Sequence, residues 1–103
     1  MSKHKIAKGD SFNTQVTITA ADGSAQDITS GTVTMTIRDR NGDTLHTEAT
    51  SSHTTPASGI TNITISKNDT VNFPIGLFDY DITVLLADSS FWTVKQGYFE
   101  VTP

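Results

Sequence analysis

The stretch that decides the fold is Lys8–Arg38, which reads KGDSFNTQVTITAADGSAQDITSGTVTMTIR. Its first run, Phe12–Ala20, alternates apolar or threonine residues with polar ones, and its second run, Thr32–Arg38, does the same with Val, Met and Ile. A period of two is typical of a strand with one buried face and one solvated face. Gly and Asp at the breaks between the runs suit turns. The stretch therefore predicts β-strands joined by turns.

The rest of the chain continues this pattern, and we expect an all-β fold, an antiparallel two-sheet sandwich of about seven strands. The expected strands are residues 12–20, 26–29, 32–39, 43–50, 59–66, 78–86 and a last strand that runs through Trp92 to Val101. Asn41-Gly42 predicts a hairpin with a type I′ turn. Between residues 67 and 75 we expect a crossover that contains one helical turn.

The last two strands require a bulge, because their apolar residues fall out of phase. In Phe78–Leu86 every even position is apolar, whereas Phe99 and Val101 are inward at odd positions. An extra residue at Gly97 turns Trp92 inward and Lys95 outward. This register pairs Leu86 with Trp92 and Tyr80 with Phe99. The predicted core contains Val33, Ile37, Tyr80, Ile82, Trp92 and Phe99.

Composition bounds the class of protein. The chain has 103 residues, which suits one domain, and it contains no cysteine that could form a disulfide or a thiolate metal site. Its net charge of −4 argues against a nucleic-acid partner, since phosphates attract dense Lys and Arg. No apolar run follows Met1, so we expect neither a secretory signal nor a membrane span, and synthesis and retention in a cytosol.

The first eight residues are basic, with Lys3, Lys5 and Lys8. We expect residues 1–8 to form an N-terminal arm and residues 9–103 to form the sandwich domain. The arm is either a fraying terminus or a segment that lies on an acidic neighbouring surface.

No catalytic, cofactor-binding or metal-binding constellation emerges from the motifs. Asp39–Asp43 resembles the start of a calcium loop but lacks the downstream Glu, so it is read as a hairpin. His4, His46 and His53 lack zinc spacing. We therefore expect no enzyme activity, no cofactor and no metal.

Surface contact is then the expected mode of action. Phe91 and Tyr98 fall outward, and the outward carboxylates of Asp79, Asp81 and Glu100 either solvate the sheet or meet a basic partner segment. The candidate interface residues are Lys3, Lys5, Ile6, Lys8, Asp79, Asp81, Leu85, Tyr98 and Glu100. Among them, Leu85 is expected to flank Tyr98 on the same outer face. Ile6 would be an apolar anchor on a neighbour, and the lysines would meet its acidic residues.

Several of these segments resemble a known family, namely Lys8–Phe12, Asp27–Thr29, Gly31–Arg38, Tyr80–Ile82 and Gly97–Val101. They are similar to the small immunoglobulin-like domains of tailed-bacteriophage virions, in particular to the N-terminal domain of baseplate upper proteins. The resemblance implies an immunoglobulin-like sandwich in a virion structural protein made in the host bacterial cytoplasm. It implies docking on other virion proteins of the capsid, neck or baseplate, and a homotrimer in the particle.

The end of the chain at Pro103, directly after the last strand, favours a stand-alone adaptor or decoration protein over part of a fibre. A carbohydrate-binding or host-adhesion sandwich module is the alternative, although such modules display several coplanar exposed aromatic residues. A specific hit on a glycan array would favour that alternative.

Overall fold

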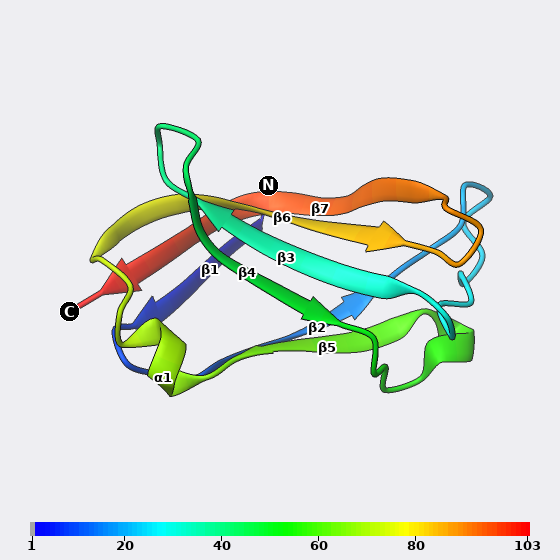
Figure 1. Cartoon of the computed structure of the whole chain (residues 1–103), viewed down its shortest axis with the longest axis horizontal. Helices are drawn as coiled ribbons and strands as arrows, with labels where there is room; N and C mark the ends of the chain where they lie inside the picture. Colours follow the sequence, from blue (N-terminus) through cyan, green and yellow to red (C-terminus); the bar gives the residue numbers. More distant parts are fainter. Residues whose placement is uncertain (1) are drawn as a thin grey trace.

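The computed structural model describes residues 2–103, so Met1 of the expected arm lies outside the described residues. The fold is all-β, with two sheets facing each other (Figure 1). The larger sheet has the order β1 (Ser2–Ala7), β7 (Phe91–Thr102), β6 (Gly76–Leu85), β3 (Thr32–Arg38) and β4 (Thr44–Thr50). The smaller sheet pairs β2 (Phe12–Thr17) with β5 (Ile60–Ile65). Two single helical turns, η1 (Pro56–Ser58) and α1 (Lys67–Thr70), flank β5.

The core lies between the two sheets. The inward side chains of β3 and β6 provide most of what the larger sheet contributes to it. Their inward positions are all buried: Val33, Met35, Ile37, Phe78, Tyr80, Ile82 and Val84. Ile63 and Ile65 of β5, with Phe12 and Val16 of β2, close the core from the other sheet. The predicted core is confirmed except for Trp92, which is only half-buried and packs against the cluster from its edge. Among the described residues, no helix is long and apolar enough to span a membrane.

The N-terminal segment is a strand and not an arm outside the domain. Residues 2–7 form β1, which pairs in parallel with β7 at the edge of the larger sheet. Lys3 and Lys5 are exposed, whereas Ile6 is buried in the core of its own domain. The expectation that Ile6 anchors on a neighbour is therefore wrong, because the alternation of Lys3, Lys5 and Ile6 directs Ile6 inward.

The segment Gln26–Thr29, expected as a strand, has an irregular backbone. Its amides bind two different segments, with the Gln26 amide donating to the Ile18 carbonyl at 3.1 Å and that of Ile28 to the Pro56 carbonyl at 2.9 Å. The carboxylate of Asp27 accepts hydrogen bonds from the amide and the hydroxyl of Thr29, which closes a local turn. This turn competes with a ladder, so β1 rather than residues 26–29 is the seventh strand.

The bulge expected in the last strand is present, but the extra residue is Val94 and not Gly97. Ile82 pairs with Lys95 and Thr83 pairs with Thr93, so Val94 is the extra residue. Lys95, expected outward, is consequently half-buried opposite Ile82. The apolar pattern requires one extra residue between the two in-phase runs, and it does not specify which residue that is.

The pairs that the sequence predicted across these strands shift accordingly. Phe99 lies opposite Phe78, and Trp92 lies opposite Val84. Gly97 lies opposite Tyr80 in regular pairing and is buried.

Both hairpins of the larger sheet use the same three-residue loop. In the first, the Gly42 amide donates to the Asp39 carbonyl at 3.0 Å, and Gly42 alone has a positive φ, of 89°. The hairpin prediction is confirmed, but the turn is not type I′, which would require a positive φ at Asn41 as well. In the second, Ser89 takes the left-handed position with φ 73°, so the loop is residues 87–89 rather than the expected 88–90.

We predict that Ile6→Ala destabilises the domain by about 2–4 kcal/mol, because it empties a buried position beneath β7. Lys5→Ala, on the exposed side of the same strand, is the control and should change stability by less than about 0.5 kcal/mol. Urea denaturation of both variants measures the difference. Equal effects of the two substitutions would contradict the docking of β1 on the core.

We predict that Gly59→Ala is severely destabilising, by about 3 kcal/mol or more. Gly59 has φ 73°, and an added Cβ would lie 2.3 Å from the Ile18 carbonyl oxygen and 2.8 Å from that of Gln26. Gly42→Ala is the control, because Gly42 has φ 89° but no atom near its Cβ position. This control should lower the free energy of unfolding by only about 1–2 kcal/mol, the strain of a left-handed backbone conformation at alanine. Thermal denaturation separates the two effects, and a Gly59→Ala variant as stable as Gly42→Ala would refute the close approach.

Candidate functional site: the outer face of the larger sheet

Cross-strand pairing arranges the outer face of the larger sheet in rows. One row runs Lys3, Tyr98, Asp79 and Arg38 across β1, β7, β6 and β3. Tyr98 is 39% exposed. The row therefore presents one aromatic ring between a lysine and an aspartate.

Two ion pairs connect this row to the adjacent ones. Lys3 Nζ lies 2.8 Å from Glu100 Oε1, and Arg38 Nη1 donates to Asp81 Oδ2. The hydrogen bond from Lys3, reinforced by its charge, lowers the pKa of Glu100 below its ordinary value. Exposed pairs of this kind contribute roughly 0–1 kcal/mol each, so they organise the face more than they stabilise the fold. Within the described part of the chain, Asp79 makes no ion pair.

A hollow of 220 Å³ lies on this face between β3, β6 and β7. It is lined by Arg38, Asp79, Tyr80, Asp81, Gln96, Gly97 and Tyr98. The outward residues of this lining combine the aromatic ring of Tyr98 with a guanidinium, an amide and two carboxylates, whereas Tyr80 is buried on the inner face. Such a surface can hold a polar side chain or a hydroxylated ligand by hydrogen bonds.

The outer face brings together most of the residues predicted to form an interface. Those on it are Lys3, Lys5, Asp79, Asp81, Leu85, Tyr98 and Glu100. Lys8 follows β1 in an exposed turn, where its amide donates to the Thr102 carbonyl at 2.8 Å. Two of the three acidic residues meet basic residues of their own chain, since Lys3 pairs with Glu100 and Arg38 with Asp81.

Leu85 is on the same face but far from Tyr98. Leu85 is 47% exposed and pairs with Phe91, which is 62% exposed, at the hairpin end of β6. Tyr98 pairs with Asp79, six residues before Leu85, which is roughly 20 Å along the strand. The predicted adjacency of Leu85 and Tyr98 is therefore wrong, and Leu85 instead forms an apolar pair with Phe91.

Arg38 and Gln96 belong to the face but were not among the predicted residues. Arg38 is in the outward phase of Thr32–Arg38, together with Thr34 and Thr36. That alternation could have identified it. Gln96 could not be assigned from alternation, because its direction depends on where the bulge in β7 occurs.

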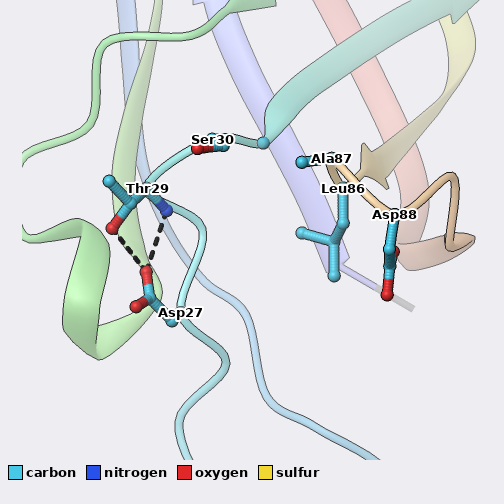
Figure 2. Close-up of a pocket in the computed structure, with 7 residues that line it drawn as sticks. Asp27, Thr29, Ser30, Leu86, Ala87 and Asp88 are labelled. Atoms are coloured by element: carbon cyan, nitrogen blue, oxygen red, sulfur yellow. Dashed lines mark hydrogen bonds between the residues drawn. The ribbon is translucent and has the colours of Figure 1, made fainter.

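A second hollow, of 320 Å³, opens where the segment after Gln26 approaches the hairpin of β6 and β7 (Figure 2). Asp27 and Asp88 lie on opposite sides of it, and both are exposed. Hydrogen bonds from Thr29 lower the pKa of Asp27, and those from Ser90 lower the pKa of Asp88. Both carboxylates already accept hydrogen bonds within turns, Asp27 from Thr29 and Asp88 from Ser90.

No protein-family model matches this chain, and neither curated proteins nor solved structures contain a match to it. The role of the outer face is therefore inferred from its geometry alone.

His4 lies on the inner side of β1, the edge strand of this sheet, opposite Phe99. Its ring lies 5.1 Å from the centroids of both Phe12 and Tyr80, and its Nε2 is buried without a hydrogen bond. Burial, and then the charge of Lys95, lower the pKa of His4 below 6.5. The folded state therefore disfavours the imidazolium.

We predict that the domain loses stability as the pH falls. The unfolded chain binds a proton at His4 near pH 6.5, whereas the folded chain binds it only at lower pH. The contribution of His4 is therefore complete above about pH 7, declines below pH 6.5 and levels off below the folded pKa. Melting temperatures between pH 7.5 and 5 should show this decline, and His4→Phe should remove most of it. An unchanged pH dependence in His4→Phe would contradict the prediction.

Proposed function

We propose that this chain is a non-enzymatic structural protein of a tailed-phage virion. It is a small immunoglobulin-like adaptor or decoration protein that docks on capsid, neck or baseplate subunits. The sequence resemblance to virion domains supports the setting. The outer face of the larger sheet, with Tyr98 between Lys3 and Asp79, is the single observation that carries the docking role.

The strand order supports the immunoglobulin-like part of the proposal. Variable-type immunoglobulin domains keep strands C, F and G in one sheet, with C′ beside them, and keep B and E in the other. The order of β7, β6, β3 and β4 in one sheet, with β2 and β5 in the other, corresponds to that arrangement. In this correspondence the outer face is that of the sheet containing C, F and G.

The chemistry of the face suits protein contact. Tyr98 provides an exposed aromatic ring, a side-chain type that anchors interfaces, and the surrounding ion pairs give it a polar rim. Leu85 and Phe91 add an exposed apolar pair at one end. A homotrimer in the particle would repeat this contact by closed symmetry. The basic residues Lys3 and Lys5 contribute to docking from within β1 rather than as a separate arm.

We predict that Tyr98→Ala leaves the fold intact but reduces incorporation into phage particles at least tenfold, the cost of losing one interface anchor. Gln15→Ala, at an exposed position of β2 in the other sheet, is the control and should incorporate normally. Quantitative mass spectrometry of purified particles gives the occupancy. Absence of the wild-type chain from particles, or full occupancy of Tyr98→Ala, would refute the proposal.

A carbohydrate-binding role is the second candidate, and the hollow beside Tyr98 favours it. The ring could stack on a sugar while Asp79, Gln96 and Arg38 hydrogen-bond its hydroxyls. A glycan array distinguishes the two functions. A specific glycan that binds the wild type and Gln15→Ala but not Tyr98→Ala would replace the docking proposal with this one.

A further inference from the structure

Three side chains with metal-ligating atoms converge between β4 and α1. They are His46, Glu48 and Asp69, and one donor atom of each lies within 4.8 Å of the other two. His46 Nε2 and Glu48 Oε1 are already 3.0 Å apart. Among residues 2–103 this is the one group of three or more such side chains that approach so closely.

The backbone brings these residues together for identifiable reasons. His46 and Glu48 are two residues apart in β4, so they lie on the same face of the strand. Their register partners, Ile37 and Met35, are buried, which places both side chains on the inner face at the edge of the larger sheet. Asp69 comes from α1, in the crossover between β5 and β6.

This composition is unusual for an inner face. The inward residues of β3 and β6 are all apolar, whereas β4 places an imidazole and a carboxylate there, both half-buried. Removing a carboxylate from water costs free energy unless a partner offsets it. The pair of His46 and Glu48 offsets part of that cost, and a cation between Glu48 and Asp69 would offset more.

We propose that His46, Glu48 and Asp69 bind a divalent first-row transition metal ion, for which Zn²⁺ is the best fit. One imidazole nitrogen and two carboxylate oxygens are donors that Zn²⁺ accepts in four-coordinate sites, with water in the fourth position. Bond lengths of about 2.0–2.2 Å place neighbouring ligand atoms about 3–3.6 Å apart. The imidazole and the Glu48 carboxylate already have this spacing, and the Asp69 oxygen lies within 4.8 Å of both ligand atoms, so it needs to approach by at most about 1.5 Å.

The surroundings hold the ligands in place. The ring of Phe73 packs 5.4 Å from that of His46, centroid to centroid, and restricts its orientation. The Ser66 hydroxyl donates to Asp69 Oδ2 at 3.2 Å. Such supporting contacts orient metal ligands and raise affinity. The two carboxylates together carry the charge that neutralises a divalent cation.

The metal would cross-link β4 to α1. β4 is the outermost strand of the larger sheet, and α1 belongs to the connection between the two sheets. An ion bound by both therefore joins the free edge of one sheet to the segment that leads from the other. This role does not depend on the proposed docking function, because the cluster lies on the inner face of the sheet and the docking residues on its outer face.

The test is titration of the metal-stripped full chain with Zn²⁺ by calorimetry, and with Co²⁺ by its visible d–d absorption. We expect one site of micromolar or tighter affinity, and Zn²⁺ at a hundredfold excess over its Kd should raise Tm by roughly 10 °C. The ring resonances of His46, rather than those of His4 or His53, should shift on binding.

Matched variants separate this cluster from scattered surface ligands. Asp69→Asn changes an exposed residue of the cluster and should weaken binding at least tenfold without loss of far-ultraviolet dichroism. Asp79→Asn, an exposed aspartate on the opposite face, should bind like the wild type. Absence of a saturable site, equal weakening by both variants, or shifts at His4 or His53 instead of His46 would overturn the proposal.

Discussion

Burial of the inner faces of β3 and β6 against the smaller sheet is the constraint on which the rest of the structure depends. These two strands are neighbours at the centre of the larger sheet, and their inward side chains are at most 7% exposed. Each buried Val, Ile or Phe contributes about 1.5–3 kcal/mol. A slip of one residue would exchange this apolar set for threonines, aspartates and Arg38, so the register is strongly determined. The composition of the outer face follows directly from it.

The bulge at Val94 transmits this register to the last strand. Without an extra residue, Phe99 and Trp92 could not both face inward opposite β6. With it, Tyr98 and Glu100 point outward beside β1 and β6, where they meet Lys3 and Asp79. A local irregularity in one strand thus determines which polar groups share the candidate docking face.

The two edges of the larger sheet differ in chemistry. At one edge, β1 adds Ile6 to the core, and the ring of His4 packs against Phe12 and Tyr80. At the other edge, β4 directs His46 and Glu48 inward, toward Asp69. The first edge is stabilised by apolar burial that low pH weakens, and the second offers ligands that a metal ion could join.

The sequence by itself determined the all-β class, five strands to within two residues at each end, and the inward and outward phases of β3 and β6. These features depend on period-two alternation, which is local. Alternation also identified Asp79, Asp81, Tyr98 and Glu100 as outward residues before any pairing was known. Only the tertiary structure decided that residues 2–7 form a strand and that the bulge is at Val94. It alone brought Asp69 to His46 and Glu48. Each of these depends on contacts between segments far apart in the chain, and such contacts leave no periodic signal within either segment.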